Sequence, residues 1–437
     1  MVPTEPTFSL FFNYLWQIIK NWWWLPAPFI LWKPASYFWL WYKTEEFIKK
    51  QKFILLEIKI PKESLKPIRA MEDVMVGLWQ AFWDPPNFWE KWWEGKISLG
   101  FSLETVSIDG DIHFYIRFPD YRRDIVESSI YSQYPEAEIN LAEDYTKNVP
   151  QDIPNKDWEM WAADYRLLKP NPYPIKTYLE FEKETEREEE KRIDPVATLL
   201  ETMAKIKPGE QLWVQFQCSS ISEDAAKPFL KEGEALRDRL ARRPEEAKRK
   251  PIAQETADLL VSGKMPGEEE KPEEREIIPP EMKLTPGERE IIAGVERKIS
   301  KPSFECSIRF IFLGRKEVWF KANLRLIFAY FGSYFTNNMN ALVPMGKTIT
   351  KVVSRPPLSI LDLRRLYLRK RKILRLYRER FAPMFPLEGD RDTGTFILNA
   401  EELASLYHFP SKAVAPAPGV PRVEAKRGGA PPELPES

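Results

Sequence analysis

The sequence contains very few of the side chains that bind metals or act as nucleophiles. Its 437 residues include only two cysteines, Cys218 and Cys306, and two histidines, His113 and His408. Two cysteines exclude a disulfide framework and a four-thiolate zinc site, and they suit a reducing compartment. The histidines are nearly three hundred residues apart, which removes most histidine-based catalytic schemes. We therefore predict that the protein is not an enzyme and has no catalytic residue, metal site or cofactor.

The chain also has no net charge and few glycines. Lys+Arg and Asp+Glu each number 65, so the overall charge indicates no class of partner. Eighteen glycines against 39 prolines indicate stiff connectors and a loop-rich chain. A chain of this length forms roughly two to four domains.

The N-terminal segment lacks a long uncharged run, yet it is very rich in aromatic residues. Residues 8–42 hold fifteen aromatic side chains and only two charged ones, Lys20 and Lys33. No uncharged run within this block exceeds twelve residues, whereas a membrane-spanning helix needs roughly 20 apolar residues. Trp and Tyr prefer the headgroup level of a bilayer, where the ring is buried and its polar atom stays hydrated.

These features predict that residues 1–52 form a membrane anchor, an aromatic helical hairpin in one leaflet with the prolines at its turn. A single tilted span from Phe8 to Trp32 is an alternative, and so is a surface covered by protein instead of lipid. Lys43 and the lysines after it normally stay on the cytoplasmic side, so the body is expected there. The tryptophans predicted to contact lipid are Trp16, Trp22, Trp23, Trp24, Trp32, Trp39 and Trp41.

Residues 53–146 alternate between strand and helix patterns, which predicts an α+β fold. The Asp109-Gly110 pair is a strong signal for a two-residue hairpin turn in the middle of this stretch. The order β-α-β-β-α-β is that of a ferredoxin-like module. The predicted elements are, in order, Phe53–Ile60, Pro67–Phe82, Ser98–Ile108, Ile112–Phe118, Arg122–Tyr134 and Ala137–Tyr145.

A second stretch, residues 157–221 and 301–350, repeats this order, so two ferredoxin-like modules are expected in tandem after the anchor. Residues 222–300 would interrupt its central hairpin. They are rich in charged residues and proline and hold almost no aromatic residues, which predicts a mobile insertion with charged helices at most. The predicted elements are residues 158–168, Ile175–Phe181 as a continued or second strand, a helix from Asp194, Gln211–Ser220, Phe304–Leu313, Val318–Phe335 and Ala341–Val343.

Residues 355–382 are predicted to form a basic amphipathic helix. From Arg355 to Arg380 there are ten basic and two acidic residues, a net charge of 10 − 2 = +8. Such a helix binds anionic lipid, nucleic-acid phosphate or an acidic partner, or it simply presents a solvated face. The basic patch comprises Arg364, Arg365, Arg369, Lys370, Arg371, Lys372, Arg375 and Arg378.

The segment Ala341–Thr348 matches a relaxed phosphate-binding loop, with Lys347 placed to neutralise a phosphate. The strict pattern has glycine where this chain has Ala341, and a helix should follow it. A degenerate nucleotide hydrolase is therefore the least favoured alternative function, after a DNA-handling module that uses the basic helix.

Three stretches together resemble the region that precedes the motor in membrane-anchored, coupling-protein-like ATPases of type IV secretion and conjugation systems of small-genome bacteria. They are Leu55–Pro61 with Ala70–Glu72, Tyr131–Pro135 with Glu138, Ile139 and Glu143–Tyr145, and Phe396–Pro410. The resemblance includes no catalytic motif and no ATPase domain.

The resemblance implies a membrane-attached adaptor that positions a separate P-loop ATPase at the cytoplasmic face of the cell inner membrane. Residues 383–437 would be a motor-docking helix and a Pro-rich tail, unless the helix folds back on the second module. Membrane lipid and the ATPase are the expected partners, and DNA and a second copy of the chain are further candidates. The docking residues implied are Leu403, Leu406, Tyr407, His408 and Phe409.

Overall fold

The chain forms two compact units. Residues 1–52 and 84–98 make up unit 1, and residues 53–83 and 99–437 make up unit 2. The computed structural model describes residues 27–60, 66–183, 194–221, 223–243, 284–319, 324–353, 358–381 and 394–410, with short pieces at 14, 16–17, 20–21 and 356.

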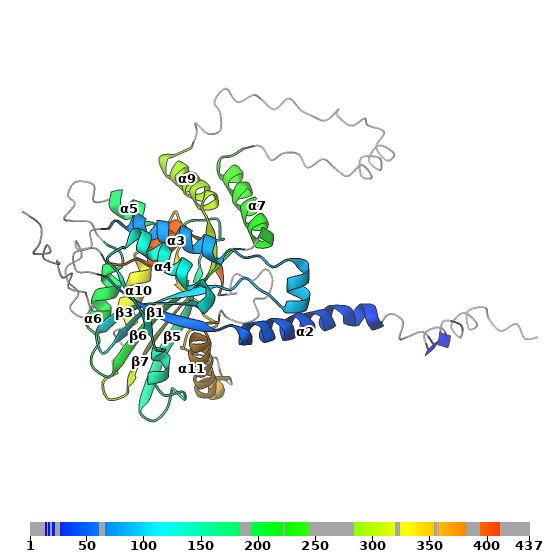
Figure 1. The fold of residues 1–437 in the computed structure, drawn as a ribbon, viewed down its shortest axis with the longest axis horizontal. Helices are drawn as coiled ribbons and strands as arrows, with labels where there is room; N and C mark the ends of the chain where they lie inside the picture. Colours follow the sequence, from blue (N-terminus) through cyan, green and yellow to red (C-terminus); the bar gives the residue numbers. More distant parts are fainter. Residues whose placement is uncertain are drawn as a thin grey trace, which may run out of the picture. The chain divides into compact units, whose positions relative to one another are not determined.

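Unit 2 is built on one antiparallel sheet with the strand order β4-β1-β3-β2-β6-β7-β5-β8, and β9 pairs with the free part of β7 (Figure 1). Helices and strands are mixed along the chain, which confirms the predicted α+β class. The strands are β1 (Phe53–Lys59), β2 (Phe101–Ile108), β3 (Asp111–Pro119), β4 (Glu138–Ala142), β5 (Trp158–Leu167), β6 (Glu210–Ser220), β7 (Ser303–Arg315), β8 (Leu342–Pro344) and β9 (Phe396–Asn399).

The two halves of the sheet have the same internal order and meet through their second strands. Strand β2 pairs antiparallel with β6, from Phe101 opposite Cys218 to Ile108 opposite Gln211. Both strands are buried on both faces because they lie at the centre of the sheet. Gly100 precedes this junction, and a Cβ there would lie 2.2 Å from the carbonyl oxygen of Cys218. The tandem order predicted from sequence did not reveal this edge-to-edge pairing.

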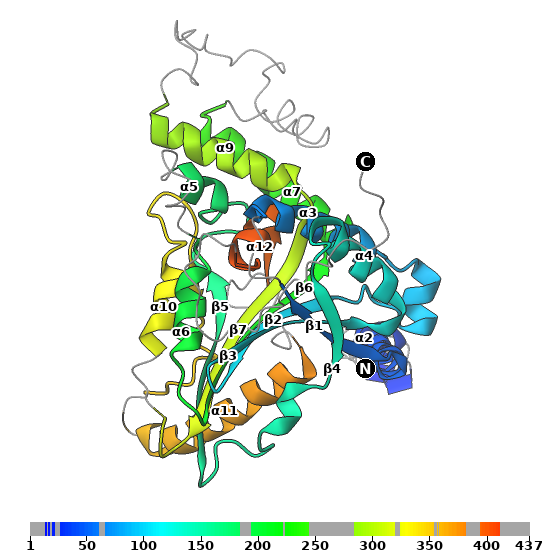
Figure 2. The same cartoon turned by 60° about the vertical axis from the view of Figure 1, so that its left-hand side comes forward.

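One face of the sheet carries the larger hydrophobic core. The apolar face of α3, which includes Met71, Met75 and Leu78, is buried there. The helices that cover this face are α3 (Ile68–Phe82), α4 (Arg123–Gln133), α6 (Ala197–Ala204), α10 (Leu324–Gly332) and α12 (Ala400–Leu406). Figure 2 shows them on one side of the sheet and α11 (Asp362–Glu379) on the other.

The opposite face has a smaller core that combines both halves of the sheet. Trp213 of β6 packs against Tyr145 and against Tyr377 of α11, with ring centroids 5.2 and 5.3 Å away. Tyr145 begins η3 (Tyr145–Asn148), whose following loop adds Val149 and Ile153 to this core. The basic helix therefore folds onto the sheet along part of its length.

Several element predictions need correction. Residues 175–181 do not form a strand, because α5 (Tyr178–Lys183) begins within them. The helix expected over Val318–Phe335 is α10, and residues 320–323 lie outside the described residues.

The charged insertion has a helix at each of its ends, and the first agrees with the charged helix expected over Asp224–Arg242. Helix α7 (Glu223–Leu240) packs on α9 (Pro286–Ser300), where a Cβ on Gly233 would meet the Ile299 side chain at 2.4 Å. Lys298 of α9 is fully buried and lies 3.1 Å from Glu402 of α12. The expected mobile arm is thus wrong for α9, because a charged residue of the insertion has its partner inside the core. Residues 244–283 lie outside the described part of the chain.

Unit 1 contains α2 (Ala27–Lys50) and η1 (Glu90–Glu94). Helix α2 continues through Pro34, so this proline does not form the turn of a hairpin. In its last two turns Lys49 forms an ion pair with Glu45, and Lys50 forms one with Glu46. The two partners of each pair are one helical turn apart. Within the described residues, no helix is both long enough and apolar enough to cross a membrane.

Candidate functional site

The segment 84–98 is shaped by its own short-range contacts. Asn87 and Glu90 cap each other, since each side chain accepts a hydrogen bond from the backbone N–H of the other. Gly95 ends η1 in the left-handed conformation, with φ +71°. Lys96 then pairs with Asp84 and Glu90 at 3.2 and 3.4 Å, which closes the segment. These contacts fold a Trp-rich stretch that lies between the predicted elements Pro67–Phe82 and Ser98–Ile108.

This segment packs against α2 through tryptophan. The indole Nε1 of Trp39 donates a 2.8 Å hydrogen bond to the carbonyl oxygen of Trp92. The Trp39 ring also meets Trp93 edge to face at a centroid distance of 6.0 Å. Gly95 lies so close to α2 that a Cβ would be 2.2 Å from the carbonyl carbon of Lys43. Residues far apart in sequence therefore form one structure in unit 1.

The aromatic side chains of this structure are largely exposed, between 41% and 72%. Isolated exposed rings are ordinary, but a group of this size marks a surface that meets lipid or another molecule. We call this group the aromatic surface. It consists of Trp32, Tyr37, Phe38, Trp39, Trp41 and Tyr42 of α2 and Phe88, Trp89 and Trp93 of the 84–98 segment.

The predicted lipid-contacting residues agree in part with this surface. Trp32, Trp39 and Trp41 belong to it, and Trp16 is also exposed. Trp22, Trp23 and Trp24 lie outside the described residues. Phe88, Trp89 and Trp93 were missed, although their density in the sequence matches that of the N-terminal block.

The C-terminal half of α11 is a structural element. Ile373, Leu374 and Tyr377 are buried against the sheet. Two members of the predicted basic patch are engaged here. Lys370 lies 2.5 Å from Glu159. Arg378 donates to the side chain of Gln151 and to the carbonyl oxygens of Val149 and Pro150. Lys370 and Arg378 therefore hold α11 in place and are not part of a free basic surface.

A buried ion-pair network lies at the C-terminal end of α11. Arg380 adopts a left-handed conformation with φ +53° and reaches Glu104 at 3.0 Å and Asp144 at 2.5 Å. Tyr145 donates a 2.7 Å hydrogen bond to the same Glu104 carboxylate. Burial alone would raise the pKa of Glu104, but the charge of Arg380 and these hydrogen bonds hold it below its usual value. The network ties the helix to the centre of the sheet.

The N-terminal half of α11 is exposed. Along one stripe of the helix, exposure rises from 0% at Tyr377 to 8% at Lys370 and 81% at Leu363, two turns apart each time. The helix thus extends beyond the packed part of the sheet. The exposed basic residues along the whole of α11 are Arg364, Arg365, Arg371, Lys372 and Arg375. The exposed apolar residues of η7 (Leu358–Leu361) and α11 are Ile360, Leu361, Leu363, Tyr367 and Leu368.

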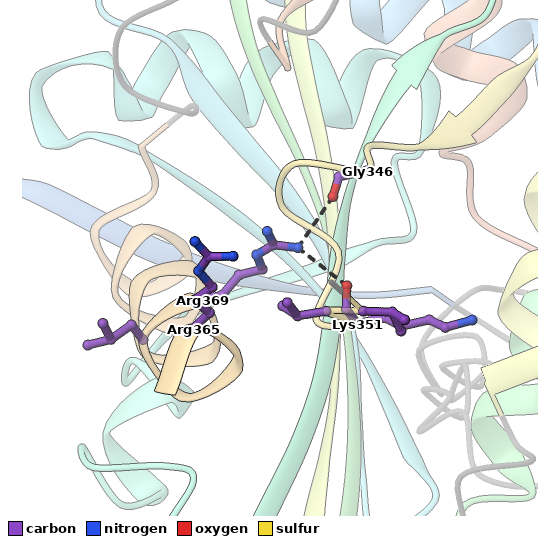
Figure 3. A pocket seen from close by; sticks show the side chains of 7 residues that line it. Gly346, Lys351, Arg365 and Arg369 are labelled. Carbon is purple, nitrogen blue, oxygen red and sulfur yellow. Dashed lines mark hydrogen bonds between the residues drawn. The ribbon is translucent and has the colours of Figure 1, made fainter. Parts of the chain in front are cut away.

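This exposed half borders an open pocket of about 500 Å³. Nη1 of Arg369 donates to the carbonyl oxygens of Gly346, Ile349 and Lys351 at 3.3, 2.9 and 3.4 Å. The guanidinium groups of Arg365 and Arg369 point the same way, toward the loop that carries Gly346 (Figure 3). Partial burial, and then the charge of Arg365, lower the pKa of Arg369. The pocket is lined by Gly346, Lys351, Val352, Val353, Arg365, Leu368 and Arg369.

The pocket is lined by residues of two sequence features, the basic helix and the Ala341–Thr348 motif. The geometry of that motif does not match a phosphate-binding loop. The backbone N–H groups of Met345, Thr348 and Ile349 all donate to carbonyl oxygens of the protein. No α-helix follows the motif directly, since residues 351–353 are irregular. The polar groups that line the pocket are therefore arginine side chains and not the backbone N–H groups of a phosphate-binding loop.

The residues implied for motor docking lie inside unit 2. Leu403, Leu406, Tyr407, His408 and Phe409 are all buried in the core on the helical face of the sheet. The hydroxyl groups of Tyr330 and Tyr334 donate to the carbonyl oxygens of Leu406 and Ser405. This placement favours the alternative in which α12 folds back, although it packs on α3 of the first half as well as on the second. These side chains present no surface to another protein in this structure.

His408 has a specific partner there. Its Nε2 lies 2.8 Å from Asp194, and its Nδ1 is 2.9 Å from the carbonyl oxygen of Ala404. Burial opposes the charged form of His408, but the Asp194 carboxylate outweighs it and raises the pKa of the imidazole. The reciprocal effect of His408 lowers the pKa of Asp194, against the effect of burial.

Within the part of the chain that the structure describes, no cluster of three His, Cys, Asp or Glu side chains is placed to hold a metal ion. A scan against models of known protein families and a search of curated proteins found no match for this chain. The exposed aromatic surface and the arginine pocket are thus the two candidate functional sites.

Proposed function

We propose that the protein is a membrane-attached, non-enzymatic adaptor of a type IV secretion-like or conjugation-like system, which holds a separate P-loop ATPase at the cytoplasmic face of the inner membrane. The aromatic surface is the observation that carries the membrane part of this proposal. Exposed Trp and Tyr rings on α2 and η1 have the chemistry of the bilayer interface, and Lys43, Lys49 and Lys50 follow them on α2.

The body of the adaptor is proposed to consist of two ferredoxin-like modules. The strand order β4-β1-β3-β2 and its repeat in β8-β5-β7-β6 support this, because βαββαβ modules have that order. Pairing of β2 with β6 joins the modules into one rigid platform, which suits a positioning role.

The ATPase partner is proposed from the sequence resemblance. Because the residues implied for docking are buried, we assign the motor contact to residues 411–437, which lie outside the described residues. Full-length chain and a variant ending at Pro410 should be titrated against the candidate ATPase. Equal binding by both would contradict the role of the tail, and no binding by either would contradict the adaptor function.

Vesicle flotation tests the membrane part. Full-length protein should float with phosphatidylcholine vesicles, and the triple variant Trp32→Ser/Trp41→Ser/Trp89→Ser should partition at least about tenfold less, since each interfacial Trp contributes on the order of 1 kcal/mol or more. Tyr121→Ser is the matched control, because Tyr121 is equally exposed but belongs to unit 2. Unchanged flotation of the triple variant would exclude the aromatic surface as the anchor.

A further inference from the structure

The two ends of the strand order are edge strands that differ in how well they are protected against pairing with another chain. Strand β8 is three residues long and ends in Pro344, and both features discourage such pairing. Strand β4, which has the same place in the first half of the sheet, is five residues long and contains no lysine, arginine or proline. Its register with β1 runs from Lys59 opposite Glu138 to Leu55 opposite Ala142 without a bulge. The β4 edge therefore lacks most of the features that protect an edge strand.

The outer side of β4 is open. Strand β4 lies at the end of the strand order and, within the described residues, pairs only with β1 (Figure 2). No loop or turn in the described part of the chain forms a backbone hydrogen bond with residues 138–142. In an edge strand about half of the N–H and C=O groups point away from the sheet, where they can pair with another strand. The edge is also accessible, since Glu138, Asn140 and Leu141 are exposed.

The apolar side chains of β4 show what an added strand would cover. Ile139 packs against the larger core on the helical face of the sheet, and Ala142 packs against the smaller core on the opposite face. Since side chains alternate along a strand, Leu141 lies on the helical face with Ile139. Leu141 is 64% exposed, because β4 is the last strand on this side of the sheet. A strand added at this edge would cover Leu141 and extend the larger core.

We propose that β4 pairs antiparallel with β4 of a second copy of this chain, about a two-fold axis through Asn140. This register pairs all five residues of the strand and places Leu141 opposite Ile139 of the second copy. Glu138 is the only charged residue of β4, and it lies opposite Ala142 of the second copy, so no like charges face each other within the strand pair. The same patch is used by both copies, as in most two-fold dimers.

The neighbouring two-fold registers fit less well. An axis through Leu141 would place Glu138 opposite Asp144 of the second copy, where like charges repel. An axis through Ile139 would pair only residues 138–140 of the two strands with each other. The self-complementary register about Asn140 is what favours a second copy over a strand from another protein. The dimer does not depend on the proposed membrane attachment or on the ATPase.

The size of the contact sets its expected strength. A five-residue strand pair is smaller than a typical stable interface, which buries about 800 Å² on each partner. We therefore expect a dimer that dissociates on dilution, and its test must trap the contact instead of relying on the molecular mass at equilibrium.

Cysteine cross-linking of the full-length chain tests the register. Cys218 and Cys306 are buried, so a cysteine added on β4 is the accessible thiol. Asn140→Cys should form a disulfide-linked dimer under mild oxidation with diamide, because residues on the two-fold axis have Cα atoms about 5 Å apart. Glu138→Cys is the matched control, since its two copies would be roughly 13 Å apart along the strands, beyond the reach of a disulfide. Equal cross-linking of the two variants, or none of Asn140→Cys, would overturn the proposal.

A mixture of variants tests the antiparallel direction. Differently tagged Glu138→Cys and Ala142→Cys chains should form a cross-linked heterodimer, although neither should form a homodimer alone. Homodimers of either variant in place of the heterodimer would overturn the register. An edge that accepts a strand of another protein instead of a second copy would leave Asn140→Cys and the mixture without cross-links.

A charge on the edge tests the apolar contact. In the Asn140→Cys chain, Leu141→Lys should slow cross-linking by about fivefold or more, because both Leu141–Ile139 contacts of the dimer are lost and the edge gains a lysine. Leu168→Lys is the matched control, since Leu168 is also exposed but follows β5 in the other half of the sheet. Equal cross-linking rates in the two double variants would indicate random collision and overturn the edge pairing.

Discussion

Aromatic side chains are abundant in both units of the molecule, but the two units use them in opposite ways. In unit 2, Trp213, Tyr165 and Phe310 are buried, and their rings pack against other rings from the sheet and its helices. In unit 1, Trp32 and Phe88 are 69% and 72% exposed. The same residue types therefore stabilise the fold in one unit and are exposed on the surface in the other.

The difference comes from what each unit has available to cover an aromatic ring. Unit 2 has helices on one face of its sheet and α11 on the other, and these layers cover the rings of its two cores. In unit 1, α2 and η1 both contribute rings to their contact, and rings such as Trp32, Phe88 and Trp89 remain exposed. Apolar area left exposed in a folded chain is available to a bilayer or a partner.

The largest expected effect tests this comparison through stability. Trp213→Ala should lower the free energy of unfolding by about 3–5 kcal/mol, since it leaves a cavity beside Tyr145 and Tyr377. Trp89→Ala should change it by no more than about 0.5 kcal/mol, because the ring is already exposed. Urea denaturation followed by circular dichroism measures both. A large loss for Trp89→Ala would show that the aromatic surface is part of the fold, and the contrast between the units would be lost.

Periodicity in the sequence predicted the strands of the sheet except β9, which lies in the segment expected to dock the motor. Each strand pattern from Phe53 to Val343 corresponds to an observed strand apart from residues 175–181. Periodicity reports which side of an element is apolar, but it does not report which edges meet. The junction of β2 with β6 was therefore invisible, because both are fully buried strands with no edge signal.

Charge patterns were less reliable guides than apolar ones. Lys370, Arg378 and Lys298 occur in charged runs that predict solvated surfaces, yet each has a buried or partly buried partner in the fold. Such partners are distant in sequence, as Lys298 and Glu402 show, so only the tertiary structure identifies them. The arginine pocket was missed for the same reason, because its loop and its helix were considered separately.

The next prediction breaks the contact that creates the aromatic surface. Gly95→Ala should separate η1 from α2, because alanine disfavours φ +71° by about 1–2 kcal/mol and its Cβ would clash with Lys43. Limited proteolysis should then cut residues 84–98 faster, while the melting of unit 2 stays unchanged. Gly346→Ala is the control, since a Cβ there meets nothing within 4 Å. Equal cleavage of residues 84–98 in both variants would mean that they do not depend on α2.

The smallest expected effect concerns the pH dependence of the two units. The raised pKa of His408 means that its pair with Asp194 stabilises unit 2 fully below pH of about 6.5, and that this contribution is lost as the pH rises through the folded-state pKa. The lowered pKa of Asp194 sets the other limit, since its contribution is present above pH of about 4 and is lost on further acidification. The pair thus stabilises unit 2 most between these limits.

His408→Gln should therefore remove a decline in the unfolding free energy of the parent protein between neutral and mildly alkaline pH. Chemical denaturation at a series of pH values measures this slope. Partition of the parent protein onto phosphatidylcholine vesicles should stay level over the same range, because Trp rings do not titrate there. If His408→Gln keeps the parent slope, another group controls the stability of unit 2. If instead partition onto vesicles falls with pH as the unfolding free energy does, membrane contact depends on the fold of unit 2, and the two units do not act independently.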